Sequence, residues 1–394
     1  MSEAVSPPVA TPGWTLPATY YLDQHVFEAE LATVFRDGWL FAGHSYELAG
    51  AGDYLLFTLG DEEVIIVRDE DGLLRAHHNV CRHRGSRICA EPRGTVRALV
   101  CPYHQWTYGL DGRLRAARLM GDDFAKNEQR LTPAAVREVA GLVFISLADE
   151  PPDFAAAATA FGAQLAPHRL EHTRIVHRAS YRVNANWKTL VENNRECYHC
   201  RGNHPEFLES NFEYGSHGDL RRSSTYDSLL ATAYERWTAD GLAPDDVSFP
   251  DGQWFRVARL PLRDGFRTES LDGAPVAPPL GEVGDDPGSL RLIGLPTLWA
   301  HANLDYAVTT RLTPIGPSVT DVEVCFLVAA NAADDDVDLD RLTAVWTVTS
   351  EQDWQLCEAN YAGIRSRAYR PGPLSPVAEA SVQHFLECYL AALG

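Results

Sequence analysis

Two short motifs, each holding one cysteine and one histidine, place the strongest constraint on how this chain folds. Cys81 and His83 stand in "CRH", and Cys101 and His104 stand in "CPYH", with seventeen residues between His83 and Cys101. Each motif ends a β-rich run and enters a loop that contains glycine. Two adjacent loops of this kind can bring all four side chains to one metal centre.

The spacing of these ligands separates two kinds of metal site. Zinc fingers of the same composition group cysteine with cysteine and histidine with histidine, whereas here each loop carries one of each. The chain resembles the Rieske proteins, whose pattern is C-x-H-R-G, about seventeen residues, then C-P-x-H-x-W. The resemblance implies a Rieske [2Fe-2S] cluster on the two cysteines and two histidines. Four further positions match the pattern: Arg84, Gly85, Pro102 and Trp106. Cys89 has no partner in it and is expected to be a buried thiol.

Length and charge limit the possible domain organisation and the possible binding partners. The length of 394 residues predicts more than one domain. Its formal net charge of -20 disfavours nucleic acid and anionic membranes as partners. The first residues lack the pattern of a signal peptide, and apolar runs such as "GLVFISLA" are too short to cross a bilayer. These features predict a cytoplasmic protein whose eight cysteines are thiols or metal ligands, not a disulfide scaffold.

The pattern of residue types along the sequence predicts three segments. Residues 1–39 hold an N-terminal helix, capped by Asp23, that we expect to pack on the catalytic domain. Residues 40–150 are short β-rich runs, and residues 151–394 mix strands with long helices, notably over 338–364.

A second cluster of metal-binding residue types lies in "RECYHCRGNH", residues 195–204. Cys197 and Cys200 form a CxxC pair, which zinc sites and redox proteins use, but no second CxxC and no βαβ context accompany it. We therefore interpret them as packing thiols. His199 and His204 are the alternative ligands of this segment.

The run "WKTLVENNRECYH" predicts a helix through His199, which breaks between Gly202 and Pro205 and so turns His204 toward the same metal. Two histidines and one carboxylate form the facial triad of non-haem Fe(II) oxygenases. Asp353 lies on the apolar stripe of the predicted C-terminal helix, where an unpaired carboxylate is unfavourable. It is therefore the candidate third ligand.

Together the motifs "NWK", "E-x-Y-H-x4-H" and "QDW" resemble, in order, the catalytic domain of Rieske non-haem iron ring-hydroxylating oxygenase α subunits. The resemblance implies an α+β chain, with an N-terminal all-β Rieske domain and a START-like helix-grip domain built on an antiparallel sheet. It implies Fe(II) on His199, His204 and Asp353, with Asn193 nearby. It also implies a homotrimer, in which electrons pass between neighbouring subunits.

Glu196 departs from the family, where an aspartate commonly links a cluster histidine to an iron histidine across the subunit interface. Carried over, Glu196 would connect His104 of one subunit with His199 of the next. The glutamate, with "ENNRECYHCxxNHPE", "CPYHQWTY" and "YRPGPLS", resembles the branch that N-demethylates quaternary ammonium compounds such as glycine betaine and stachydrine.

The implied reaction uses O2 and electrons from NAD(P)H, which a separate flavin- or ferredoxin-type reductase supplies, because no GxGxxG fingerprint follows a strand here. Hydroxylation of an N-methyl group would release formaldehyde. Alternatives are hydroxylation or O-demethylation of an aromatic acid, and a Rieske electron carrier without its own catalysis. Aromatic side chains available for a quaternary ammonium lie between the iron motifs: Phe212, Tyr214, Phe249, Trp254, Phe255, Trp299 and Tyr306.

Overall fold

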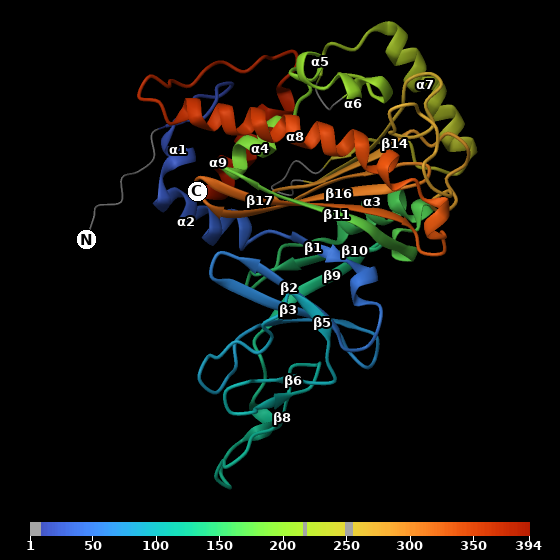
Figure 1. Cartoon of the computed structure of the whole chain (residues 1–394). Coiled ribbons are helices and arrows are strands. Elements are labelled where there is room, and N and C mark those ends of the chain that lie inside the picture. Colours follow the sequence, from blue (N-terminus) through green and yellow to red (C-terminus); the bar gives the residue numbers. More distant parts are fainter. Residues whose placement is uncertain (1–8, 216–218, 249–254) are drawn as a thin grey trace. The chain divides into compact units, whose positions relative to one another are not determined.

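The computed structural model describes residues 9–215, 219–248 and 255–394. Backbone contacts divide the chain into two compact units (Figure 1). One unit is Phe35–Phe154, and the other joins Ala155–Gly394 with Val34 and the residues before it. Within the described ranges, no helix has both the length and the apolar composition needed to span a bilayer.

The regular structure of the unit Phe35–Phe154 is mostly strand, as predicted, with loops between the strands. Its larger sheet has seven antiparallel strands in the order β1-β10-β9-β4-β3-β2-β5, and a second sheet has the order β6-β7-β8. Their bounds are β1 Leu40–His44, β2 Asp53–Leu59, β3 Glu62–Arg68, β4 Leu74–His78, β5 Arg93–Thr95, β6 Leu99–Val100, β7 Thr107–Tyr108, β8 Leu114–Ala116, β9 Pro133–Val139 and β10 Leu142–Ser146. A buried core joins the small sheet to the Cys-His motifs.

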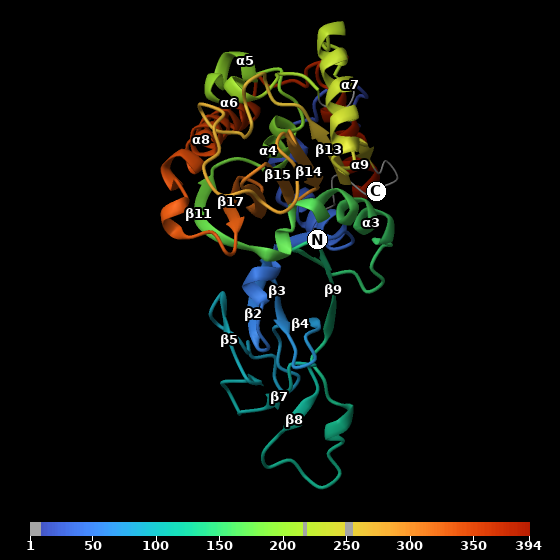
Figure 2. The same ribbon diagram turned by 90° about the vertical axis from the view of Figure 1, so that its right-hand side faces the viewer.

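The other unit combines one antiparallel sheet with helices, which confirms the α+β prediction. The strand order is β11-β17-β16-β15-β14-β13-β12. The strands are β11 Thr173–Val183, β12 Val247–Ser248, β13 Phe255–Leu260, β14 Ser289–Gly294, β15 Leu298–Ala302, β16 Ala307–Gly316 and β17 Val319–Ala329. The helices are α1 Thr19–Leu22, α2 Gln24–Glu30, α3 Ala155–Leu165, α4 Trp187–Asn194, α5 Cys200–Asn203, α6 Pro205–Ser210, α7 Ser224–Ala239, α8 Leu339–Ile364 and α9 Ala380–Leu393. Figures 1 and 2 show α8 lying along one face of this sheet.

Helix α8 forms where the sequence predicts it. The side chain of Asp338 caps its first turn by accepting a hydrogen bond from the backbone N–H of Arg341. Leu342 and Val345 are fully buried on the face toward the protein. Asp353 lies two turns beyond Val345 on this helix, so packing of the apolar stripe determines where its carboxylate lies.

The helix that we predicted through His199 is shorter, because α4 ends at Asn194. The carboxylate of Glu196 accepts hydrogen bonds from the backbone N–H groups of Tyr198 and His199. A side chain that satisfies backbone donors in this way competes with helical hydrogen bonds and favours a turn. The predicted break before Pro205 is present, since α5 ends at Asn203 and His204 lies between α5 and α6.

A buried carboxylate holds α4 in place. Glu30 of α2 accepts hydrogen bonds from Nε1 of Trp187 at 2.8 Å, from the hydroxyl of Tyr389 at 2.6 Å, and from the ammonium of Lys188. All four side chains are buried. Removing Lys188 or Glu30 alone would leave an uncompensated charge in the core, so this network fixes the helix that leads into residues 195–204.

Candidate active site

The two Cys-His loops share one backbone geometry. The N–H of Gly85 donates to the carbonyl of Cys81 at 2.9 Å, and the N–H of Gln105 donates to the carbonyl of Cys101 at 3.0 Å. Gly85 and Gln105 both adopt a left-handed conformation, with φ of 77° and 61°. Each loop therefore turns sharply four residues after its cysteine.

The four side chains converge. Cys81 and Cys101 are buried free thiols in mutual contact, and the rings of His83 and His104 lie 4.5 Å apart between centroids. Nδ1 of both histidines is buried and has no hydrogen-bond partner in the described part of the chain. Two orphaned ring nitrogens beside two thiols fit a cluster that takes two sulfur and two nitrogen ligands.

Aromatic side chains cover this centre. The indole of Trp106 stacks on His83 with ring centroids 4.7 Å apart, and the hydroxyl of Tyr108 lies 3.3 Å from Sγ of Cys81. The guanidinium of Arg84 donates to the hydroxyl of Tyr103 at 3.1 Å. Cys89 is a buried free thiol, as predicted, and burial raises its pKa to about 11.

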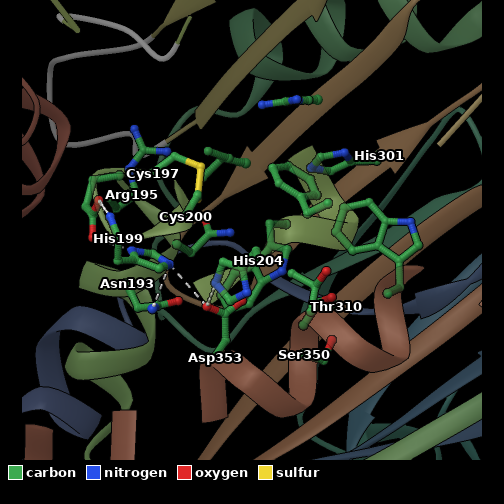
Figure 3. Close-up of a pocket in the computed structure, with 18 of the residues that line it drawn as sticks. Asn193, Arg195, Cys197, His199, Cys200, His204, His301, Thr310, Ser350 and Asp353 are labelled. Atoms are coloured by element: carbon green, nitrogen blue, oxygen red, sulfur yellow. Dashed lines mark hydrogen bonds and ion pairs between the residues drawn. A yellow bond between two sulfur atoms is a disulfide. The ribbon is translucent and has the colours of Figure 1, made fainter. Parts of the chain in front are cut away.

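The second centre lies in the catalytic unit, where three predicted ligands meet (Figure 3). Oδ1 of Asp353 lies 3.3 Å from Nε2 of His199 and 2.8 Å from Nε2 of His204. Nε2 of His204 is buried and lacks hydrogen-bond geometry to any described residue, although Asp353 is this close. Asn193 Nδ2 lies 3.3 Å from Nε2 of His199. The donor atoms thus face one point, as metal ligands do.

The outer nitrogen of each histidine has its own acceptor. Nδ1 of His199 lies 2.6 Å from Oε1 of Glu196, and Nδ1 of His204 lies 2.7 Å from Oε1 of Gln352. Gln352 in turn donates to Glu206 at 3.2 Å, which fixes the orientation of its amide. Both acceptors place the ring proton on Nδ1 and leave the Nε2 lone pair for a metal, the arrangement found around metal-bound histidines.

The charges agree with this arrangement. Burial lowers the pKa of His199, but hydrogen bonds to Asp353 and Glu196 outweigh burial and raise it to about 9. The same contacts hold the pKa of Asp353 below its ordinary value despite burial. The site therefore has one carboxylate and two imidazoles drawn together by charge, an arrangement that a divalent cation would replace by direct ligation.

The two cysteines of this segment are not the packing thiols that we predicted. Cys197 and Cys200 are joined by a disulfide (Figure 3), while the other six cysteines are free. Sγ of Cys200 lies within 4.8 Å of ligand atoms of His199 and His204, so a reduced Cys200 is an alternative third ligand. Because the disulfide engages this sulfur, Asp353 stays the candidate third ligand.

A pocket opens over the three converging side chains. The sheet forms one wall through β13 to β16, and α8 forms another through Trp346, Thr349, Ser350, Asp353 and Trp354. Aromatic rings line it: Phe207, Trp299, Trp346 and Trp354. Of the aromatic residues singled out from the sequence, Trp299 lines this pocket, while Phe212 and Tyr214 pack on Tyr226. Phe249 and Trp254 lie outside the described residues.

The fold and both centres are matched by two family models. Residues 38–127 match the Rieske [2Fe-2S] domain, and residues 170–394 match the ring hydroxylating alpha subunit (catalytic domain). The chain belongs to the Rieske non-haem iron oxygenases, the class that its fold and two centres define. Its cofactors are accordingly a Rieske [2Fe-2S] cluster and a mononuclear iron, and a separate reductase supplies the electrons.

Two relatives that the chain matches over most of their length share one name. The chain is 41% identical over 382 residues to the glycine betaine monooxygenase oxygenase subunit of Chromohalobacter salexigens, covering 95% of this chain and 85% of the relative. It is 39% identical over 383 residues to the subunit of the same name from Pseudomonas aeruginosa, covering 95% and 88%. A crystal structure of a quaternary ammonium Rieske monooxygenase with L-carnitine shares the fold, with a TM-score of 0.69, 22% identity, and coverage of 97% and 95%.

Two groups of site residues were missed from the sequence. Gln352 directly precedes Asp353 and accepts a hydrogen bond from His204. Its place in "QDW" indicates this role only when the orientation of the helix is known. Arg195 and Arg291 line the pocket. Arg291 interrupts an otherwise apolar strand, which is a signal for a side chain that faces a polar cavity and not the core.

Proposed function

We propose that His199, His204 and Asp353 hold the mononuclear iron, and that Cys81, His83, Cys101 and His104 hold the cluster. The converging Nε2 atoms and the orphaned Nδ1 atoms support this assignment. When bound, the cluster supplies electrons and the iron activates O2 for hydroxylation of a C–H bond. Glu196 and Gln352 keep the proton on the outer nitrogen of each iron histidine, and Asn193 lies beside Nε2 of His199.

We propose that the substrate is a small quaternary ammonium compound such as glycine betaine, and that hydroxylation of an N-methyl group yields formaldehyde and the demethylated amine. The observation that carries this proposal is the aromatic pocket over the ligand set. A quaternary ammonium offers no N–H donor, so aromatic faces are its natural partners. Relatives named glycine betaine monooxygenase oxygenase subunit point the same way.

We further propose that Glu196 lies at the boundary between neighbouring subunits of a homotrimer. Its Oε1 holds His199, and in this arrangement the carboxylate also receives the ring N–H of the neighbour's cluster histidine, His104. The described part of the chain supports the first half of this link. The domain limits 1–39, 40–150 and 151–394 and the cytoplasmic location stay predictions.

A substrate panel with formaldehyde detection tests the function. Holoenzyme, a competent reductase, NAD(P)H and O2 should release formaldehyde from glycine betaine or a close quaternary ammonium relative, with matching loss of one methyl group. Aromatic acids serve as the comparison, because aromatic walls also bind arenes. Turnover of aromatic acids alone would replace the proposal by ring hydroxylation or O-demethylation.

A further inference from the structure

Three arginines line the pocket of this strongly acidic chain: Arg195, Arg256 and Arg291. Arg256 is paired with Asp246, whose Oδ2 lies 2.6 Å from its Nη2. Arg195 and Arg291 have no carboxylate within ion-pairing distance in the part of the chain that the structure describes. Burial and the nearby Arg256 lower the pKa of Arg195 to about 9. Two of the three guanidinium groups in the pocket therefore have no carboxylate partner of their own.

Arg291 is the better placed of the two unpaired cations. Its Nη2 donates to Oδ1 of Asn211 at 2.6 Å, and its guanidinium carbon lies 5.8 Å from the ring centroid of Phe207. Its Nε is buried and has no hydrogen-bond partner among the described residues. Nη2 is thus held by Asn211 while the Nε–H is unused, and a buried donor without a partner is unfavourable.

The carboxylate of Glu269 interacts with Arg291 through space and is held by other partners. Glu269 is buried and accepts hydrogen bonds from Nδ1 of His301 at 3.0 Å and from Nδ2 of Asn303 at 3.0 Å. Burial opposes its ionisation, but His301, Arg291 and Asn303 together lower its pKa to about 2. Glu269 thus offsets part of the charge of Arg291 through space, and its oxygens stay engaged by His301, which pairs with Arg291 across strands β14 and β15.

The contacts of Arg291 connect it to the aromatic residues of the pocket. Phe207, on which its guanidinium lies, packs against Trp346 with ring centroids 6.0 Å apart. Trp346 stands seven residues before Asp353 in α8, about 10 Å along the helix axis. Aromatic faces that suit an ammonium group therefore line the same pocket as Arg291 and the three converging side chains.

We propose that Arg291 binds the carboxylate of the substrate, so that the enzyme selects quaternary ammonium compounds that also carry a carboxylate over those that carry the ammonium alone. This inference rests on the proposed function for the ammonium half. A planar guanidinium with a buried, unpartnered Nε–H and no carboxylate of its own suits a substrate carboxylate, which accepts charge-assisted hydrogen bonds. Arg195 adds positive potential to the same cavity.

Binding to the holoenzyme, measured by calorimetry, tests this assignment without turnover. Three ligands separate the two halves of the substrate: glycine betaine, choline, which lacks the carboxylate, and tert-butylacetate, the uncharged-head isostere that keeps the carboxylate. Arg291→Gln should weaken glycine betaine and tert-butylacetate roughly 100-fold, the size expected for loss of a buried charge-assisted pair, and should change choline by less than about threefold. Arg291→Lys should restore part of the loss.

Arg311→Gln is the matched control. Arg311 belongs to the same sheet, alternates with the pocket residue Thr310 on β16, and pairs with Glu323 at 3.4 Å. It should leave all three ligands unchanged. Equal weakening of choline in Arg291→Gln would assign the residue a structural role through Asn211, and wild-type protein that binds neither carboxylate ligand would overturn the proposal. Wild-type protein that binds tert-butylacetate but neither ammonium compound would instead refute the proposed function and leave the carboxylate site standing.

Discussion

Gln352 accepts a hydrogen bond from Nδ1 of His204 at 2.7 Å, while its neighbour in α8, Asp353, faces the other nitrogen of the same ring. Two consecutive residues of one helix therefore fix both edges of one imidazole. The acceptor orients the ring and raises its basicity as a ligand.

Replacing Gln352 by leucine should weaken iron binding roughly 10- to 100-fold, because the outer hydrogen bond of His204 is lost. Iron content after dialysis against a chelator measures this, and the visible spectrum of the cluster should not change. Glu351→Gln, at the exposed neighbouring position, is the control. Unaltered iron retention in Gln352→Leu would show that the contact has no influence on the metal.

Asp353→Ala should remove the mononuclear iron and all turnover while the cluster spectrum persists, because two imidazoles alone bind Fe(II) weakly. Metal analysis before and after iron reconstitution gives the stoichiometry. Asp340→Ala changes an exposed carboxylate at the start of the same helix and should retain both metals. Full activity in Asp353→Ala would rule out this residue as a ligand.

Glu196→Gln should keep both metals but slow oxidation of the reduced cluster by at least about 10-fold in single-turnover experiments with substrate and O2. The amide keeps an acceptor for His199. It loses the charge that, in the proposed trimer, holds two imidazole N–H groups. Stopped-flow absorbance follows the reaction. Wild-type rates would exclude Glu196 from the electron path.

Tyr108→Phe should lower the reduction potential of the cluster. Its hydroxyl lies 3.3 Å from Sγ of Cys81, and a hydrogen bond to a ligand sulfur stabilises the more negative, reduced cluster. A redox titration followed by electron paramagnetic resonance measures the midpoint. Tyr103→Phe removes a hydroxyl that Arg84 binds and should leave the potential near that of the wild type. Equal midpoints in Tyr108→Phe and wild type would contradict the assignment.

Glu192 makes the stability of the protein depend on pH near neutrality. Burial raises the pKa of its carboxyl to about 7, although the hydroxyl of Tyr21 and the charge of Lys188 both lower it. The native state therefore holds a proton that the unfolded chain releases near pH 4.5, and stability falls as pH rises from there to about 7.

Glu192→Gln stays neutral and keeps an acceptor for Tyr21. The difference in Tm between variant and wild type should therefore grow in favour of the variant from about pH 5 to about pH 8. Thermal unfolding followed by circular dichroism supplies the values. Glu235→Gln, at an exposed position of α7, should show no such trend. A constant difference across this range would mean that Glu192 titrates normally.

The sequence alone was sufficient to pick out candidate ligand residues where a metal centre requires a fixed spacing. The two Cys-His motifs, His199 and His204 are recognisable because their loops can present ligands only at these separations, and Asp353 because a carboxylate on an apolar stripe needs a partner. The α+β architecture was implied by the family resemblance, and the period of the apolar residues predicted the helix over 338–364. The end of α4 at Asn194 was missed, because the turn made by Glu196 competes locally with a helix that propensity favours.

The remaining parts depend on tertiary pairing. We predicted free thiols at Cys197 and Cys200 because no neighbouring motif required a disulfide. The turn nevertheless brings their Cα atoms to within 4.9 Å of each other. Arg291 joins the pocket through strand register, which places it beside His301 from another strand. No local pattern encodes which strands pair, so the place of Arg291 in the pocket could be recognised only from the folded chain.

The network around Glu30 has a consequence for the order of folding. The carboxylate lies on α2, the groups that it binds lie on α4 and α9, and the whole unit Phe35–Phe154 is translated between the first two of these helices. During synthesis, the carboxylate of Glu30 on α2 therefore stays exposed to water until Tyr389 emerges from the ribosome. We expect the β unit to fold early around its local contacts. We expect residues 195–204, which hold the candidate iron ligands His199 and His204, to reach their final conformation late.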